Sequence, residues 1–245
     1  MVNGSSPAAS APVLALRSLK FSWRNAFADC IDIDSFDMQP AERVFLHGPS
    51  GCGKSTLLAL LGGVLVPRGG EIRLLDRGWN SLSPWARDAY RVAHIGYIFQ
   101  QFNLLPYLSA MENVELPCRL SRRREQNSRR NFASSRRQAE HLLNEMELER
   151  TLWKRTAAEL SVGQQQRVAA ARALIGLPEL VLADEPTSAL DEERRAAFLR
   201  LLLQMCVEAG SALVFVSHDK RLAAHFDRQV SLPTINRAPA AEQIL

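Results

Sequence analysis

The strongest constraint on the fold is a glycine-rich turn between a predicted strand and a predicted helix. The turn and the residues that open the helix are Gly48, Pro49, Ser50, Gly51, Cys52, Gly53, Lys54, Ser55 and Thr56. The apolar run 43–47 predicts a short buried strand, and the leucine-rich run 57–61 predicts a helix. A G-x-x-x-x-G-K-[ST] match in this context predicts a site for the phosphates of a nucleoside triphosphate.

Each residue type in this phosphate loop has a physical reason. Glycines let backbone N–H groups turn inward and approach phosphate oxygens, because no Cβ stands in the way. The following helix presents the positive end of its dipole to the same anion. We expect Lys54 to reach the β- and γ-phosphates and Ser55 to ligate Mg²⁺. The motif by itself predicts that a nucleotide binds and leaves its fate open.

Length and composition set broad limits. The 245 residues can bury a core in one large or two small domains. A net charge of +4 does not by itself indicate a nucleic-acid or membrane partner. No secretory signal and no apolar run of the roughly 18 to 20 residues that span a bilayer is evident, so we expect a chain that is soluble on its own. Widely spaced cysteines fit reduced thiols of a cytosolic protein, and they are Cys30, Cys52, Cys118 and Cys206.

The order of predicted elements indicates an α/β fold. Continuously apolar strands near the C-terminal half are typical of a sheet covered on both faces. The helix after the phosphate loop is expected to stop near Pro67, and a long helix is expected over 192–209. Residues 1–12 predict a disordered N-terminal tail, and 233–245 predict a short C-terminal tail. Strands are predicted over 13–23, 30–38, 43–47, 71–75, 94–99, 180–183 and 212–216.

Residues from about 103 to 158 contain no convincing strand and are rich in Arg and Glu, which predicts a helical insertion into the α/β core. Within it, 139–146 has apolar residues at helical spacing. The stretch 121–137 holds one glutamate, Glu125, and seven arginines: Arg122, Arg123, Arg124, Arg129, Arg130, Arg136 and Arg137.

Three interpretations of this arginine-rich stretch stay open. The simplest is a solvated helix face or a mobile loop. The second is contact with anionic lipid headgroups beside a membrane partner. Contact with RNA is the third, and because Phe132 is the sole interleaved aromatic residue, we expect no nucleic-acid partner.

Two strand ends bring candidate catalytic groups toward one edge of the sheet. Strand 180–183 leads into Asp184 and Glu185, and strand 212–216 leads to His218. The carboxyl ends of parallel strands are where α/β folds build ligand sites. The alternatives are a helix N-cap for the acidic pair and an ordinary surface or core position for the histidine. Ser161 is a good N-cap for the run of helix-forming residues after it.

The run Leu160-Ser161-Val162-Gly163-Gln164 resembles the signature of one family, the ATP-binding subunits of ABC transporters. The resemblance covers about residues 13–232, as one ABC ATP-binding domain. It implies a P-loop NTPase core of the RecA-like kind, with an N-terminal antiparallel β subdomain and an inserted α-helical subdomain. Further motifs resemble the family's in the same chain order: Trp23, the phosphate loop, Gln100, Asp184-Glu185, Ser188–Asp191 and His218.

The resemblance implies a role for each matched residue. Trp23 would stack on adenine, although a Trp on an edge strand is often ordinary packing. Asp184, with Ser55 and Gln100, would hold Mg²⁺. The catalytic set would be Glu185 as general base, His218 on the γ-phosphate, Lys54 and Gln100. Ser161, Gly163 and Gln164 would contact the ATP of a second copy, so that two ATP molecules lie in a head-to-tail dimer.

The exact residues within these motifs are similar to those of the lipoprotein-release and macrolide-efflux type of ATPase, with two departures from the usual family sequence. Val162 replaces the first glycine of the usual signature, and Trp23 replaces the more usual tyrosine. The implied function is an ATPase on the cytoplasmic face of the cell membrane that drives a separate integral membrane permease. The cargo and the direction of transport stay undetermined.

Two other function classes are compatible with a phosphate loop. One class is an ABC ATPase that regulates a membrane complex without transport. The other is a small-molecule kinase, which the signature helix disfavours.

Cys52 lies beside Lys54 and a helix N-terminus, both of which favour a reactive thiolate. Its alternative is a filler residue.

Overall fold

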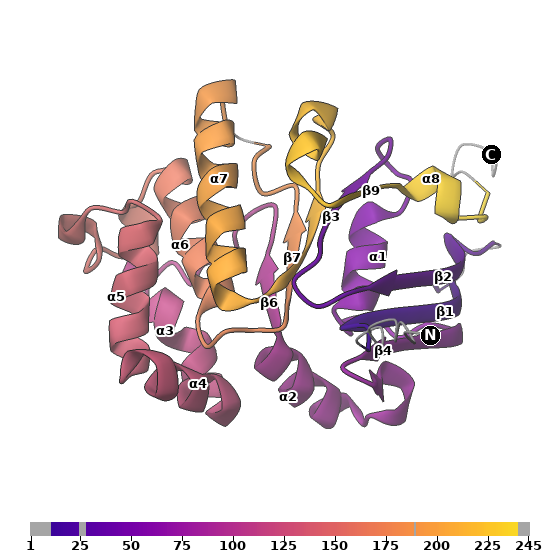
Figure 1. Ribbon diagram of the computed structural model, residues 1–245, viewed down its shortest axis with the longest axis horizontal. Coiled ribbons are helices and arrows are strands. Elements are labelled where there is room, and N and C mark those ends of the chain that lie inside the picture. The colour runs from indigo at the N-terminus through magenta and orange to yellow at the C-terminus, as the bar shows by residue number, and fades with distance from the viewer. Residues whose placement is uncertain (1–10, 25–27, 189, 240–245) are drawn as a thin grey trace, which may run out of the picture.

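The computed structural model describes residues 11–24, 28–188 and 190–239. An antiparallel sheet lies at one side, a parallel sheet at the centre and a group of helices at the other side (Figure 1). The strands are β1 Leu14–Phe21, β2 Ile31–Met38, β3 Arg43–His47, β4 Gly69–Leu74, β5 Arg77–Gly78, β6 Ile95–Ile98, β7 Leu180–Asp184, β8 Ala212–Val216 and β9 Arg228–Ser231. The helices are α1 Lys54–Leu61, α2 Pro84–His94, α3 Ala110–Leu120, α4 Arg122–Phe132, α5 Ser135–Glu145, α6 Val162–Leu174, α7 Glu192–Ala209 and α8 Leu232–Ile235.

The parallel sheet has the strand order β6-β7-β8-β3-β9 and is buried on both faces. Alternate residues of β7 pack into two different apolar clusters. Val181 and Ala183 face the cluster that includes α6 and α7, whereas Leu180 and Leu182 face the cluster that includes α1 and the antiparallel sheet. Side chains of a strand alternate between faces, so a strand without polar residues needs apolar cover on both sides. The fold is the α/β P-loop NTPase fold that the sequence predicts.

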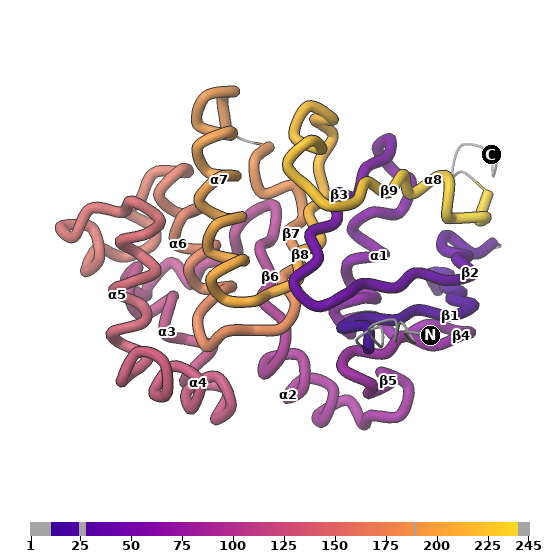
Figure 2. Tube along the Cα trace, in the orientation of Figure 1, coloured from indigo at the N-terminus to yellow at the C-terminus, as the bar shows by residue number. Residues whose placement is uncertain are grey.

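The antiparallel sheet has the order β2-β1-β4-β5, with β2 at an edge. The register places Phe21 opposite Ile31, so β1 ends where β2 begins. That end of the sheet lies next to the phosphate loop (Figure 2). The proximity is shown by Ile31, whose Cδ1 lies 2.9 Å from the position that a Cβ on Gly53 would take. The two sheets therefore meet at the phosphate loop.

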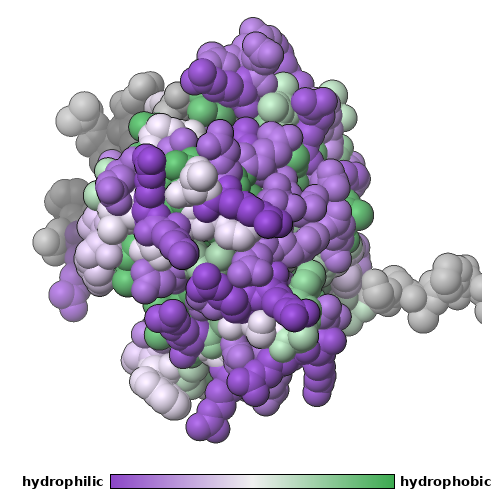
Figure 3. Space-filling view, turned by 90° about the vertical axis from the view of Figure 1, so that its left-hand side faces the viewer, coloured by the Kyte–Doolittle hydropathy of each residue, from purple (hydrophilic) through white to green (hydrophobic). Residues whose placement is uncertain are grey.

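The arginine-rich stretch 121–137 is helical and lies mostly in α4 and α5. The outward face of this helical region is largely hydrophilic (Figure 3). Arg124 differs, since it is fully buried and donates to the carbonyls of Val92, Ile95, Ala173 and Ile175. Burial lowers the pKa of Arg124 to about 10. One of the seven arginines thus joins α4 to the core and takes no part in a solvated face.

Several element boundaries differ from the predictions. The helix α1 ends at Leu61 and not near Pro67, because Gly62 and Gly63 follow and Gly63 has φ +65°. The helix α2 had no predicted counterpart. The predicted C-terminal tail is wrong over 233–239, where α8 and the residues after it contact the antiparallel sheet. The predicted N-terminal tail lies outside the described residues except for 11 and 12.

Candidate functional site

The phosphate loop connects β3 to α1, and Gly53 is the N-cap of that helix. Gly53 has φ +99°, and a Cβ there would collide with Ile31 Cδ1. Both observations require glycine at this position. Within the described residues no side chain caps α1, so its first N–H groups are free to bind an anion in the loop.

The Lys54 ammonium lies under this loop and is 6% exposed. It donates to the carbonyls of Gly48 at 3.0 Å and Pro49 at 2.9 Å. The Glu185 carboxylate lies 3.9 Å from Lys54 Nζ. A buried cation with polar partners on one side can act as a fixed positive charge toward phosphate oxygens.

Asp184 ends β7 and is buried beside Ser55. Burial raises the pKa of Asp184, while a hydrogen bond from Ser55 acts in the opposite direction. Its Oδ1 atom is buried and has no hydrogen-bond partner in the described part of the chain. Buried carboxylate oxygens without a partner are costly unless a cation satisfies them, and hard oxygen ligands suit Mg²⁺. Ser55 and Gln100 line the adjacent cavity and can offer a hydroxyl and an amide oxygen, so the chemistry of these residues fits Mg²⁺.

Glu185 and His218 follow neighbouring parallel strands and contact each other. His218 Nε2 lies 2.5 Å from Glu185 Oε1. Glu185 has φ +46°, a backbone region that non-glycine residues rarely occupy, and its N–H donates to Val216 O. Strained backbone conformations of this kind cluster at functional sites, and this one lies at the carboxyl edge of the parallel sheet.

Most of these groups line one polar cavity, and Asp184, which is not among the lining residues, is connected to it through Ser55. Its lining consists of Ser50, Gly51, Gly53, Lys54, Ser55, Thr56, Gln100, Glu185 and His218. Gln100 reaches it from the turn after β6 and is exposed. Trp23 lies outside this lining, beyond the end of β1, where its ring is 52% exposed and packs edge-to-face on Phe21.

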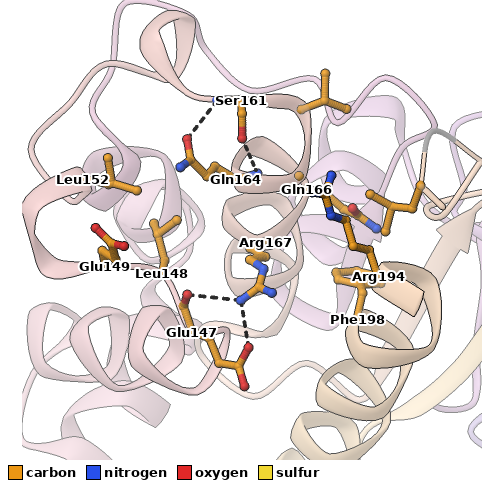
Figure 4. A pocket seen from close by; sticks show the side chains of 13 residues that line it. Glu147, Leu148, Glu149, Leu152, Ser161, Gln164, Gln166, Arg167, Arg194 and Phe198 are labelled. Atoms are coloured by element: carbon orange, nitrogen blue, oxygen red, sulfur yellow. Dashed lines mark hydrogen bonds and ion pairs between the residues drawn. The ribbon is translucent and has the colours of Figure 1, made fainter. Parts of the chain in front are cut away.

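The signature residues lie on a different surface. Ser161 and Gln164 form a capping box at the start of α6, each side chain bonded to the other's backbone N–H. Figure 4 shows this pair beside a second cavity, with Arg167 further along α6 bonded to Glu147. The two cavities share no residue of the described chain. One copy of the chain therefore does not bring the signature to its own phosphate loop.

The family comparison agrees with this geometry. The model of the ABC transporter family matches residues 31–188, a segment that contains the phosphate loop, Gln100, the signature and the acidic pair. The chain belongs to the ABC transporter family. It is an ATP-hydrolysing subunit of that family.

Two relatives illustrate the type of ABC ATPase. A lipoprotein-releasing system ATP-binding protein LolD of Psychrobacter arcticus is 44% identical over 191 residues, 78% of this chain and 81% of the relative. A second LolD protein, from Caulobacter vibrioides, is 40% identical over 232 residues, 91% of this chain and 95% of the relative. The resemblance to the lipoprotein-release type is confirmed.

A solved structure is similar over nearly the whole ABC domain. It is a dimeric, post-hydrolysis state of the ATP-binding cassette MJ0796 bound to ADP and Pi, with 32% identity and a TM-score of 0.77. The match covers 93% of this chain and 98% of that one. Among the described residues, none of the helices is both long and apolar enough to cross a membrane.

Sequence reasoning missed an interaction network next to His218, here called the ionic clamp and formed by Arg195, Asp219 and Arg221. Arg195 on α7 donates to Leu190 O at 2.9 Å and to the Asp219 carboxylate at 2.5 Å. Asp219 follows His218, and hydrogen bonds from Arg221 and Arg195 hold its pKa well below the usual range. The clamp joins the loop before α7 to the histidine loop. In the sequence Arg195 is one of many helix arginines, so no pattern distinguished it.

A second missed feature follows Gln100. Phe102 and Asn103 have φ +59° and +47°, and Arg172 of α6 donates to both of their carbonyls, at 2.5 and 2.7 Å. Burial lowers the pKa of Arg172 to about 10. The strained turn that carries Gln100 is thus fixed to the signature helix. The residue types in this turn gave no signal of the left-handed conformation.

Proposed function

We propose that this chain is the ATPase of a transporter whose membrane-spanning permease is a separate polypeptide. The observation that carries the proposal is the separation of the phosphate cavity from the signature surface within one chain. Two copies arranged head to tail would complete two nucleotide sites. The dimeric state of the similar cassette structure supports this arrangement.

Binding of ATP would use two parts of the same copy. Loop N–H groups, Lys54 and Thr56 would hold the phosphates, and Trp23 offers an exposed ring for adenine. Ser55, Asp184 and Gln100 would hold Mg²⁺, which would neutralise phosphate charge. The signature residues Ser161, Gly163 and Gln164 would contact the γ-phosphate bound to the other copy.

Hydrolysis would use Glu185 and His218. Glu185 would orient the attacking water and accept its proton, and His218 would hydrogen-bond the γ-phosphate. The 2.5 Å contact between Glu185 and His218 supports the proposal that both side chains act at one point of the cavity. Lys54 would stabilise the negative charge that shifts toward the leaving group.

The permease would dock on a groove between the core and the helical insertion. This groove includes exposed apolar side chains, with Leu120 66% exposed and Val64 also exposed. Asn103 of the turn after Gln100 lines the same groove. A permease segment seated there would touch the turn that holds Gln100, so motion at the ATP site would reach the membrane partner.

The similarity to ATP-binding proteins of lipoprotein-releasing systems supports a location at the cytoplasmic face of a membrane, with a permease of that type as partner. The test is co-purification from detergent-solubilised membranes. We expect a multi-spanning protein to accompany the wild-type chain and to be lost from Leu120→Asp, while the ATP affinity of the isolated variant is unchanged. Recovery of an active ATPase without any membrane protein would contradict the permease and would favour a different role.

Anionic lipid contact is a weaker component of the proposal, because several of the seven arginines are engaged within the chain. Arg123 pairs with Glu179, Arg129 with Glu125 and Arg136 with Glu140. The exposed arginines without an ion pair in the described chain are Arg122, Arg130 and Arg137. The purified chain should sediment with anionic but not neutral liposomes at low salt. Equal sedimentation with both would reject lipid contact.

A further inference from the structure

The last described residues form a connection between the two sheets. Residues 232–237, here called the C-terminal strap, run from β9 past the phosphate loop to the edge strand β2 (Figure 1, yellow). Leu232 is fully buried. A Cβ on Gly48 would lie 3.0 Å from Pro233 Cδ, so the strap touches the phosphate loop directly.

The other end of the strap binds the start of β2 through Asn236. The side-chain amide donates from Nδ2 to Cys30 O at 3.0 Å, and its Oδ1 accepts from Asp32 N–H at 2.8 Å. Arg237 N–H donates to Asp32 O at 2.8 Å. A single asparagine therefore satisfies backbone groups on both sides of Ile31, the residue that packs against Gly53.

The proposed ATP site extends over both sheets. Phosphates would bind after β3 of the parallel sheet, and adenine would bind on Trp23 at the end of β1 in the antiparallel sheet. Cys30 N–H donates to Phe21 O at 2.8 Å, which links the strap-bound end of β2 to the strand that leads to Trp23. The spacing of the two subsites depends on how these sheet ends are joined.

We propose that Asn236 is a positioning residue for nucleotide binding. By tying Cys30 and Asp32 to a strap that rests on the phosphate loop, it sets the distance between the adenine platform and the phosphate site. We expect Asn236 itself to act on recognition of the nucleoside, because its described side-chain hydrogen bonds to other elements go to Cys30 and Asp32 at the start of β2 in the antiparallel sheet. This inference rests on the proposed stacking of adenine on Trp23.

The test compares two ligands that differ in the nucleoside. Dissociation constants for Mg-ATP and for Mg-tripolyphosphate are measured by calorimetry on the full chain, with the melting temperature as a check of folding. Asn236→Ala should weaken ATP binding about tenfold and change tripolyphosphate binding by less than about twofold, since misplacement of one subsite costs affinity only for a ligand that uses both. Asn236→Asp, which keeps the acceptor and loses the donor to Cys30, should weaken ATP binding in the same selective way. Thr234→Ala, in an exposed position of the same turn, is the matched control and should change neither constant.

The outcomes separate this inference from the function on which it rests. Equal weakening of both ligands, or unchanged ATP binding in both Asn236 variants, would overturn the inference. Trp23→Ala measured alongside should lower the preference for ATP over tripolyphosphate. An unchanged preference there would reject the adenine platform itself, whereas a lowered preference with unaffected Asn236 variants would reject only the role of the strap.

Discussion

The phosphate loop and the signature segment both face nucleotide in the proposed function, yet their surroundings differ. Gly53 in the loop is enclosed, with a left-handed backbone and Ile31 in contact range of a Cβ. Gly163 in the signature is open, since a Cβ there would meet no described atom within 4 Å. The loop residue is required by the chain's own fold. Nothing in the described part of its own copy requires a glycine at position 163, which points to a surface completed from outside.

The largest expected effect comes from Glu185, the proposed general base. Glu185→Gln should lower the rate of ATP hydrolysis by about 10²- to 10⁴-fold, because proton transfer to a positioned base contributes on that order. Lys54 and Ser55 remain, so ATP should still bind and an ATP-stabilised dimer should accumulate. Phosphate release and size-exclusion chromatography measure the two effects. Glu193→Gln, at an exposed position of α7, is the control, and a monomeric Glu185→Gln at saturating Mg-ATP would contradict the two-copy site.

The two glycines test the comparison directly. Gly163→Val should leave the melting temperature and the ATP affinity of the isolated chain unchanged, but lower hydrolysis about 10²-fold, since a displacement of about 1 Å at a reacting centre has that effect. Dimerisation in the Glu185→Gln background should be lost as well. Gly53→Ala should instead abolish ATP binding and cost about 1–3 kcal/mol of stability from its strained backbone. Similar losses of ATP affinity in both variants would remove the distinction between an enclosed and an open surface.

Thiol modification of Cys52 tests whether the phosphate loop has room for an added group. Its Sγ would lie 2.7 Å from a Cβ on Gly48, so an alkyl group there has no room without moving the loop. We expect N-ethylmaleimide to weaken ATP binding more than about tenfold and ATP to protect, as steric disruption of a preformed site predicts. Cys52→Ser should be resistant and Cys30→Ser should stay sensitive, while Cys118 and Cys206 are buried. Full ATPase activity after complete modification, followed by mass spectrometry, would reject this prediction.

The smallest effect concerns stability at the proposed magnesium site. Burial raises the pKa of Asp184 above 3.8, so ionisation costs the folded state more than the unfolded state. The stability that this group contributes is therefore present below about pH 3.8 and is lost as pH rises through the folded-state pKa. Asp184→Asn should be more stable than wild type at pH 7, and the difference should disappear near pH 3. Denaturant unfolding at both pH values measures this, and a variant less stable at pH 7 would contradict the cause assigned to the shift.

Much of the fold and of the phosphate site could be predicted from the sequence, because the signals are local. The continuously apolar β7 and β8 predicted a doubly covered sheet, and the strand–turn–helix around Gly48–Thr56 predicted a phosphate loop. The capping pattern at Ser161 and Gln164 likewise lies within one helical turn. The predicted end of α1 was wrong, because Gly62 and Gly63 end the helix at Leu61, before Pro67.

The tertiary structure decided which distant residues act together. Arg124, Arg195 and Asn236 have no local pattern that separates them from other arginines or from a polar tail, because each has a backbone carbonyl or a side chain far away in the sequence as a partner. The order of motifs along the chain determined the family and its chemistry. The separation of the signature from the phosphate loop, and the strap that joins the two sheets, depend on packing across elements, which only the folded chain specifies.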